Sequence, residues 1–394
     1  MLGIGISLWG NRSSSSGALA LLGAEPQGLA IDFTDLTMSI RDTVTPANTF
    51  VGDPNSKLTY SSPATKWIRG ANGLYSSGTA LRTSYDTSGN RLGCLIEEAR
   101  TNICLQSSDF TSASWVKTTL TAALTATGPD GTANSASTLT ATAGNAMALQ
   151  TIVSGSAARV THVFLRRRTG SGNVDLTQDN GVTWTTQTLT ASWARYALAS
   201  VTSANPIVGI RLVTSGDAVD VAWFGHDLGA FATSPIPTTS ASVTRAADNI
   251  TLATSLFSAG TTGRTAFVNC TLVPGTTTQD LIGLNGGGFA EVNIMIVGGS
   301  NVGAINRSGG VVQYSQIGAF SGGIKAALAV ASGDVQGIVN SSLMTSGATA
   351  TVPSVTALSL HTINYIGSSY AKYIKQVAVL PRRMSNAELQ TLTT

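Results

Sequence analysis

The residues able to carry out catalysis are few and poorly spaced for it. Glu97 and Glu98 are adjacent, so on a strand they point to opposite faces and cannot form the opposed carboxylate pair of a glycoside hydrolase. The histidines His162, His226 and His361 lie near no recognisable serine or cysteine nucleophile motif. We expect His162 to be an ordinary strand residue, His226 to support a turn and His361 to open a strand. The sequence therefore predicts a protein that is not an enzyme, although two acids distant in sequence can still meet in space.

The tryptophans offer a different chemistry, because a flat exposed ring can stack on the C–H face of a sugar. Trp184, in DNGVTWTTQ, follows a turn and is flanked by threonines, so we expect it to be exposed. Trp115, in SASWVK, is placed at the edge of a sandwich. Trp184 and Trp115 are the predicted carbohydrate-binding residues. Trp193 and Trp223 lie in alternating apolar runs and are expected in the core, whereas Trp67 suits an intersubunit contact as well as a sugar.

Four loop or turn acids are candidate calcium ligands: Asp86, Asp179, Asp217 and Asp220. None lies in a run with the dense Asp/Asn spacing of a dedicated calcium loop. Turn formation explains their positions. We therefore predict no metal and no other cofactor.

Charge and hydropathy exclude two kinds of partner. The net charge is +3 and the only basic block is Arg166–Arg168, too little for the continuous cationic face that duplex nucleic acid requires. Strand alternation sends the middle arginine to the opposite face, so this block is interpreted as a solvated strand end. No apolar run near the start approaches the roughly 20 residues that span a bilayer. We expect no nucleic-acid partner and no membrane insertion, and the first residues lack the cationic region of a secretory signal.

The composition predicts a folded chain of several β-rich domains. Charged residues make up 11% of the 394 residues, apolar residues 42%, and there are 42 glycines, which favours short strands over helices and excludes a disordered chain. A surface this poor in charge is usually covered by symmetric oligomer contacts. The cysteines are too scattered for a disulfide framework or a zinc site and are predicted to be buried free thiols: Cys94, Cys104 and Cys270.

The pattern along the chain divides it into four parts. Residues 1–30 begin with an apolar stretch that is followed by the serine-rich NRSSSSG. They are predicted to be a segment that attaches the chain to a partner protein. Residues 31–100 form an irregular β-rich region, and residues 101–240 form a β-sandwich that ends at the prolines of PIPTTSAS. Residues 245–394 form a second β-rich unit.

Local signals place individual elements. In THVFLRRR, His162 and Phe164 fall on one face of a strand and Val163 and Leu165 on the other. In MSNAELQTL the serine and glutamate have capping-box spacing, and Met384 and Leu389 occupy the positions of a hydrophobic staple. This predicts a short C-terminal helix.

Three segments carry a resemblance to a known family. GCLIEEARTNICLQSSDFTSASW at 93–115 resembles a segment of bacteriophage virion proteins of the fibre and minor-tail kind. AWFGHDLGAFATSPIPTTSASVTRAADNI at 222–250 looks like the same family's exit from its carbohydrate-binding-module-like sandwich. YIGSSYAKYIKQVAVLPRRMSNAELQTL is similar to the end of concanavalin A-like and laminin-G-like jelly rolls, in which the Gly367 turn leads to a strand carrying Ile374 and Val377 and Met384 stands where leucine is usual.

The resemblance implies an all-β chain of tandem β-sandwich and jelly-roll domains, located in the virion. It implies other virion proteins as partners of the N-terminal segment, host-surface polysaccharide as a ligand of the sandwiches, and a homotrimer by analogy with phage fibres. Tail fibre, minor tail, collar fibre and head fibre all fit. The alternatives are a decoration or collar protein that binds no sugar, a polysaccharide depolymerase spike, and a bacterial adhesin outside any phage.

Overall fold

The computed structural model describes residues 27–42, 49–61, 65–274, 279–286, 291–297, 300–361 and 371–394. Within these residues the chain is built almost wholly of antiparallel strands, with one α-helix and 3₁₀ turns at Pro54–Ser56 and Thr254–Leu256. The predicted all-β fold with a short C-terminal helix is confirmed. Most of the predicted attachment segment, residues 1–26, lies outside the described ranges.

The chain forms two compact units, and it passes between them more than once. Unit 1 comprises Met1–Ser61, Ala80–Glu97 and Asp248–Thr394, and unit 2 comprises Ser62–Thr79 and Glu98–Ala247. Residues 31–100, which the sequence pattern sets apart as one irregular region, therefore contribute to both units. Unit 2 also continues past the prolines near residue 240, to Ala247.

Unit 1 consists of two sheets. The larger has the order β3-β2-β1-β32-β23-β28-β29-β30, with β8 paired to β32 and to β7. Its strands are β1 (Gln27–Asp32), β2 (Thr37–Asp42), β3 (Phe50–Gly52), β7 (Thr83–Tyr85), β8 (Arg91–Glu97), β23 (Gly263–Leu272), β28 (Ile324–Ala331), β29 (Asp334–Val339), β30 (Ser342–Leu343) and β32 (Ala371–Leu380). The smaller has the order β27-β26-β25-β24-β31-β22-β4. Its strands are β4 (Thr59–Ser61), β22 (Asn249–Ala253), β24 (Gln279–Asn285), β25 (Glu291–Val297), β26 (Asn301–Ser308), β27 (Val311–Ala319) and β31 (Ala357–Ser359).

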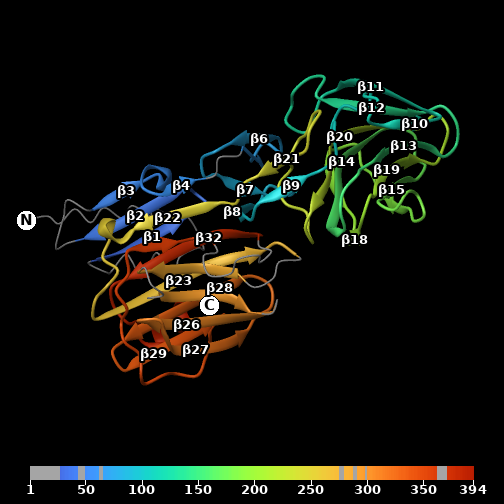
Figure 1. Ribbon diagram of the computed structural model, residues 1–394. Helices are drawn as coiled ribbons and strands as arrows, with labels where there is room; N and C mark the ends of the chain where they lie inside the picture. Colours follow the sequence, from blue (N-terminus) through green and yellow to red (C-terminus); the bar gives the residue numbers. More distant parts are fainter. Residues whose placement is uncertain are drawn as a thin grey trace, which may run out of the picture. The chain divides into compact units, whose positions relative to one another are not determined.

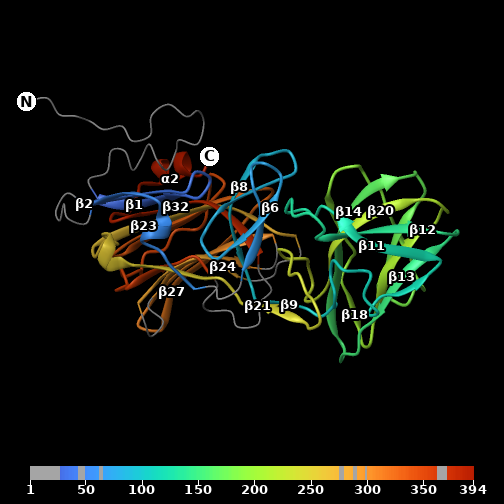
Figure 2. The same cartoon turned by 90° about the horizontal axis from the view of Figure 1, so that it is seen from above.

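Strand alternation explains how the larger sheet is covered on both faces. Along β32, Val377 and Val379 enter the core between the two sheets, whereas Ala378 and Leu380 join an apolar cluster on the opposite face. Helix α2 (Asn386–Leu392) covers that cluster and lies over β1, β32 and β23 in Figure 2. Figure 1 shows the N-terminal strands β1 and β2 beside the C-terminal β32 and β23.

The start of α2 confirms the sequence prediction in detail. Ser385 accepts a hydrogen bond from the Glu388 backbone N–H while the Glu388 side chain accepts from Ser385, which is a capping box. Met384 and Leu389, the predicted staple pair, are both fully buried in the cluster beneath the helix. Because all these signals lie within a few residues, the sequence alone was sufficient to locate them.

Unit 2 is a sandwich of a five-stranded and an eight-stranded sheet, with a separate hairpin. The five-stranded sheet has the order β10 (Val116–Thr118), β13 (Ala146–Thr151), β19 (Ile207–Leu212), β15 (Val174–Thr177) and β16 (Thr185–Gln187). The eight-stranded sheet runs β11 (Leu120–Ala126), β12 (Ala136–Ala141), β20 (Ala218–Leu228), β14 (Ala157–Thr169) and β17 (Ala194–Ala197), with β18 (Val201–Ser203), β9 (Arg100–Asn102) and β21 (Val243–Arg245) paired beside this path. The hairpin is β5 (Lys66–Arg69) with β6 (Tyr75–Gly78).

The core of unit 2 shows the predicted alternation in β14. Val163 and Leu165 lie in the core between the sheets, whereas Phe164 lies in a second apolar cluster. A bulge opposite this point in β20 places Trp223 in the left-handed region, at φ 49°, which is unusual for a bulky residue. The bulge directs Trp223 to the second cluster and the next residue, Phe224, into the main core.

The β5–β6 hairpin explains why residues 62–79 belong to unit 2. Trp67 and Tyr75 pack on the cluster that contains Phe164 and Trp223, with Trp67 and Trp223 ring centroids 4.9 Å apart. The Tyr75 backbone N–H also donates to the Pro129 carbonyl, at 3.0 Å. The hairpin thus covers an apolar patch on the eight-stranded sheet, which only the folded structure reveals.

Candidate functional site

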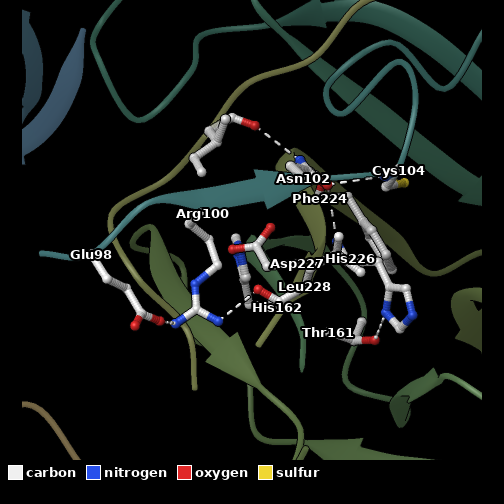
Figure 3. Close-up of polar contacts among 11 residues, drawn as sticks. Glu98, Arg100, Asn102, Cys104, Thr161, His162, Phe224, His226, Asp227 and Leu228 are labelled. Atoms are coloured by element: carbon white, nitrogen blue, oxygen red, sulfur yellow. Dashed lines mark hydrogen bonds and ion pairs between the residues drawn. The ribbon is translucent and has the colours of Figure 1, made fainter. Parts of the chain in front are cut away.

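A buried polar network joins two of the three sequence segments that bear the family resemblance, residues 93–115 and 222–250 (Figure 3). It begins at β9, which starts two residues after Glu98. Arg100 is 2% exposed. Its guanidinium donates to the Leu228 carbonyl at 2.7 Å and also contacts the Glu98 carboxylate. Its carbon lies 4.7 Å from the centre of the Phe231 ring. Arg100 therefore ties the start of the Glu98–Ala247 segment of unit 2 to the end of β20.

Asn102 makes the second tie, and all its side-chain hydrogen bonds go to the backbone. Its amide oxygen accepts from the N–H of Cys104 at 3.0 Å and of His226 at 3.1 Å. Its amide nitrogen donates to the carbonyls of Ile236 at 2.9 Å and Phe224 at 3.3 Å. Since Asn102 is 1% exposed, these groups have no access to water as a substitute.

The segment around FGHDLG needs its glycines to accommodate this network. A Cβ on Gly229, at φ 133°, would lie 1.1 Å from Arg100 Nη1. A Cβ on Gly225 would lie 2.3 Å from His162 Nε2. The spacing of glycines in this segment therefore reflects the space that Arg100 and His162 occupy.

His162 and Asp227 form a fully buried pair at the centre of the network. The His162 Nε2 atom lies 2.9 Å from the Asp227 carboxylate. Burial lowers the pKa of His162, and Arg195 lowers it further, against the opposing effect of Asp227. Burial opposes ionisation of Asp227, but His162 and nearby arginines outweigh it and lower the pKa of Asp227. At neutral pH the carboxylate is therefore ionised and accepts from the neutral ring's Nε2–H.

His226 and Cys104 are equally enclosed. His226 lies within strand β20, so the predicted turn position was wrong, and its Nδ1 is 2.8 Å from Thr161 Oγ1. Burial, with Arg159, lowers the pKa of His226 to about 4. Burial, with Asp227, raises the pKa of Cys104 well above its usual value, so it is an inert thiol. The network has the partners of a structural anchor, and none of these side chains is accessible to a substrate.

Trp184 lies on the five-stranded sheet, where its ring is half-buried. The Arg211 guanidinium stacks on the indole with its carbon 4.4 Å from the ring centre. Arg211 in turn donates to Asp175 from Nε at 3.0 Å and from Nη2 at 2.6 Å. Asp175 is 2% exposed and also accepts from Thr186 Oγ1 at 2.7 Å. A row of side chains across β19, β15 and β16 therefore holds the ring in place.

The loop before Trp184 is closed by a single carboxylate. Asp179 accepts from the Thr183 N–H at 2.9 Å, from Thr183 Oγ1 at 2.6 Å and from Thr177 Oγ1 at 2.8 Å. Asn180 and Gly181 both have left-handed backbones, as the predicted turn requires. Val182 at the tip is 81% exposed. The turn agrees with the sequence interpretation, but the predicted exposure of Trp184 was wrong: Arg211 covers the ring, which is only partly exposed.

Trp115 was the other predicted sugar-binding residue, and the structure contradicts that prediction. Its ring is 1% exposed and stacks on Phe110, with centroids 4.0 Å apart. Its Nε1 donates to the Gln106 carbonyl at 3.1 Å. A ring enclosed in this way cannot stack on a sugar. The neighbouring Ser114 instead lines a surface hollow of about 360 Å³ whose other lining residues are Ile103, Leu105, Gln150, Thr151, Ile152, Val153, Ser154 and Ser242.

Neither of two comparisons with known proteins assigns this chain to a family. No protein-family model matches the chain. No curated protein matches it either.

Among solved structures, the partial matches include botulinum neurotoxin domains. The receptor binding domain of the C/D mosaic serotype is 13% identical, with a TM-score of 0.31 over 36% of this chain and 39% of that one. The binding domain of neurotoxin DC in complex with rat synaptotagmin II is 7% identical, with a TM-score of 0.32 over 37% and 40%. The serotype D ligand binding domain in complex with N-acetylneuraminic acid is 11% identical, with a TM-score of 0.31 over 36% and 39%. The chain thus spans about two fifths of the length of these structures, and likenesses this slight do not bear on its function.

The remaining tryptophans divide between core and surface. Trp223 is 6% exposed, which confirms its predicted core position. Trp193 was also predicted in the core, but it is only half-buried at the edge of the cluster that contains Trp223. Its Nε1 donates to the Thr127 carbonyl at 3.2 Å, and the Arg166 guanidinium lies over its ring at 4.8 Å. Trp67 packs within its own unit, against Trp223.

The acids weighed as metal ligands are all engaged by protein groups. Asp86 accepts from Ser88 and Asn90 within its turn, and Asp217 accepts from the Gly172 N–H. Asp220 binds two of the three consecutive arginines, Arg166 and Arg168, while Arg167 binds Asp217. The arginine block alternates as predicted, but it forms ion pairs where a solvated strand end was expected. No group of three or more potential metal ligands occurs in the described part of the chain.

His361 Nδ1 lies 3.1 Å from the backbone of Ile250, and the strand that it was predicted to open falls outside the described residues, as does Gly367. All three cysteines are buried free thiols, as predicted. Ile374 and Val377 lie in the core of unit 1. Among the described residues, no helix is long and apolar enough to cross a membrane.

Sequence reasoning missed the buried network itself. The signal was present: a paired arginine and asparagine in EEARTN, and a glycine on each side of a histidine and an aspartate in FGHDLG. Polar residues of this kind in otherwise apolar strands indicate buried hydrogen bonds. Only the fold reveals that they meet one another.

Proposed function

We propose that this chain is a structural protein of a bacteriophage virion, in a tail fibre, minor tail or head or collar fibre, and that it presents β-sandwich units to host-surface polysaccharide. The virion assignment is supported by the resemblance of residues 93–115 and 222–250 to fibre and minor-tail proteins. Attachment to other virion proteins through residues 1–30 is part of the same proposal. The units act as passive display modules and not as enzymes.

The observation that carries the sugar-binding part is the support beneath Trp184. A stacking ring is useful to a ligand only if it is held in place before the ligand arrives. Arg211 and Asp175 hold the ring from the sheet, and the Asp179 turn holds it from the loop. The surrounding exposed side chains are mainly threonines, which offer hydroxyl groups to a sugar.

The charges around the ring favour a neutral polysaccharide. Arg211 is already neutralised by the nearly buried Asp175. An acidic sugar would therefore have to compete with an existing ion pair. Weak contacts of single sites would add together in an oligomer, for which a trimer is our proposal.

The test compares two tryptophans on an array of host-surface polysaccharides. We expect Trp184→Ala to weaken binding about tenfold or more, because loss of an aromatic anchor costs more than about 1.4 kcal/mol. Trp193→Ala is the matched control, since Trp193 is also half-buried under an arginine but belongs to the other sheet. Unchanged binding by folded Trp184→Ala protein would refute the site. An array without any ligand would favour the decoration-protein alternative, and shortened polysaccharide chains after incubation would favour the depolymerase.

The virion assignment has its own test. An antibody label against this chain, viewed by electron microscopy on intact phage particles, should decorate one structure of the particle. Absence of label from purified particles that a control capsid antibody decorates would contradict the assignment, whatever the outcome for sugar binding.

A further inference from the structure

The side chain of Lys117 points towards the interior of unit 2 from an edge strand. Lys117 is the middle residue of β10, which lies at the edge of the five-stranded sheet. Its neighbours on the strand, Val116 and Thr118, are exposed, whereas Lys117 is half-buried and pairs with the fully buried Ala148. Since side chains alternate along a strand, the lysine stem runs on the core side of the sheet.

The ammonium group of Lys117 is surrounded by backbone carbonyls of the loop that precedes β10. It donates to the carbonyls of Phe110 at 3.0 Å, Ser112 at 3.1 Å and Trp115 at 3.0 Å. The Thr111 carbonyl is the fourth, at 3.4 Å. An ammonium group has three N–H bonds, so the three short contacts use all of them, and the fourth oxygen acts mainly through its partial charge. These four oxygens form a carbonyl cage around the nitrogen.

The carbonyl cage is also held by contacts in which the ammonium takes no part. The rings of Phe110 and Trp115 are fully buried and stack with centroids 4.0 Å apart. The Trp115 N–H donates to the Ser112 carbonyl at 3.2 Å, and the Thr111 N–H donates to the Asp109 carboxylate at 3.0 Å. The four oxygens should therefore stay near their positions when the ammonium is removed.

We propose that the carbonyl cage is a binding site for a monovalent cation of the size of ammonium or potassium, and that the chain fills it with its own Lys117. The size follows from the distances between the nitrogen and the four oxygens, 3.0–3.4 Å. Calcium needs oxygen ligands at about 2.3–2.6 Å and magnesium at about 2.0–2.1 Å, so both ions are too small for this cage.

The charge of the cation follows from the chemistry of the cage. All four oxygens belong to neutral carbonyls, the groups that replace the hydration shell of potassium in its channels, whereas sites for calcium use carboxylates as well. In the wild type the lysine is attached to the chain and occupies the cage without an added ion. The stability of unit 2 should therefore not depend on the cation in the buffer. The inference depends neither on the virion role nor on sugar binding.

The first experiment removes the ammonium and offers free cations in its place. Thermal unfolding of the full chain is followed by tryptophan fluorescence in the chlorides of ammonium, potassium, sodium and choline, at equal ionic strength. Lys117→Met keeps much of the apolar stem, and in choline chloride it should unfold about 5 °C or more below the wild type, because the carbonyls lose their cation. Ammonium or potassium at about 0.5 M should raise this temperature by about 3 °C or more, and sodium by less.

The matched control is Thr118→Met, which introduces the same side chain at the next, exposed position of β10. Its unfolding temperature should respond to the four salts as that of the wild type does. The proposal is overturned if Lys117→Met gains no more from ammonium and potassium than Thr118→Met does, or if it matches the wild type in choline chloride. Lys117→Met protein that folds in none of the salts, or that only calcium chloride restores, would overturn it as well.

The second experiment tests whether the wild-type lysine occupies the carbonyl cage in solution. An acetylating reagent attacks a free amine, so an amine that is held in the cage must leave it before it can react. We expect Lys117 of the folded full chain to be acetylated about tenfold or more slowly than the exposed Lys57, as measured by peptide mass spectrometry. In urea the two rates should become equal. Equal rates in the folded chain would contradict the occupation of the cage by Lys117.

Discussion

Replacement of Asn102 by alanine tests whether the network in unit 2 is a structural anchor. The change leaves four backbone groups without their partner: the N–H of Cys104 and of His226, and the carbonyls of Phe224 and Ile236. Each buried unsatisfied group costs about 1–3 kcal/mol. Carbonyls retain a second lone pair and local relaxation admits some water, so we expect a total loss of about 4 kcal/mol. That is a large fraction of the stability of a single domain.

Tryptophan fluorescence makes this loss measurable in the intact chain. Of the six tryptophans, five belong to unit 2 and the sixth, Trp9, lies outside the described residues. Urea unfolding followed at this signal therefore reports mainly on unit 2. With a slope of about 2 kcal/mol per molar urea, Asn102→Ala should lower the midpoint by about 2 M.

The control is Thr101→Ala, one residue earlier in β9. Thr101 contacts Thr244 at 2.8 Å across an exposed position, so its loss should cost under about 0.5 kcal/mol. If Asn102→Ala shifted the midpoint no further than Thr101→Ala, the assignment of a stabilising role to the network would be refuted.

Two further predictions concern the same network. Since the folded pKa of His226 is about 4, below its usual 6.5, the unfolded chain takes up a proton that the folded chain rejects, and unit 2 should lose stability as pH falls from about 6.5 towards 4. In urea unfolding at a series of pH values, His226→Gln should reduce this loss of stability. Dependence of the stability on pH equal to that of the wild type would contradict the role given to His226. Asp227 does not contribute in this range, because its pKa is below its usual value and it titrates at lower pH. Gly229→Ala should cost at least about 3 kcal/mol, because its Cβ would displace the bonded Arg100 guanidinium. Gly216→Ala is the control: Gly216 has φ 85° and open space around it, so the change should cost only the backbone strain of about 1–2 kcal/mol. Equal losses of unfolding free energy for the two variants would show that displacement of Arg100 is not the cause.

The sequence sufficed where the deciding contacts lie close together along the chain. The capping box at Ser385 and Glu388, the turn before Trp184 and the alternation of Val163 with Phe164 each depend on fewer than ten neighbouring residues. In such cases the spacing of side chains along a helix, turn or strand determines their geometry. The all-β class followed in the same way, from many short signals that agree.

The sequence did not suffice where burial depends on distant partners. Trp115 was placed at an edge because the sequence does not reveal that Phe224, far along the chain, joins the nearby Phe110 in enclosing its ring. The hairpin of Trp67 and Tyr75 was assigned to an irregular region because the apolar patch that it covers is formed by strands far along the chain. The roles of Arg100 and Asn102 could not be predicted, because their hydrogen-bond partners at His226, Leu228 and Ile236 lie far along the chain.

Residues 93–115 and 222–250, two of the segments that carry the family resemblance, stabilise the fold and are separate from the candidate ligand site at Trp184. In 93–115, Arg100 and Asn102 anchor β9 inside unit 2, and Gly93 allows β8 to approach β32 closely, since a Cβ there would lie 2.2 Å from the Ile374 carbonyl. In 222–250, Gly225 and Gly229 make room for that anchor. Changes at these positions disturb buried contacts and are costly.

The turn at Asp179–Val182 has the opposite character. Val182 is 81% exposed, and the residues that hold Trp184 from below, Arg211 and Asp175, belong to other strands. The tip of the turn can therefore change without loss of the buried network. A resemblance confined to anchoring segments accordingly predicts how the chain is built, whereas the identity of a ligand depends on the ring and on the loop beside it. This is why the sugar-binding assay at Trp184, and not any further comparison of the anchoring segments, decides what the chain binds.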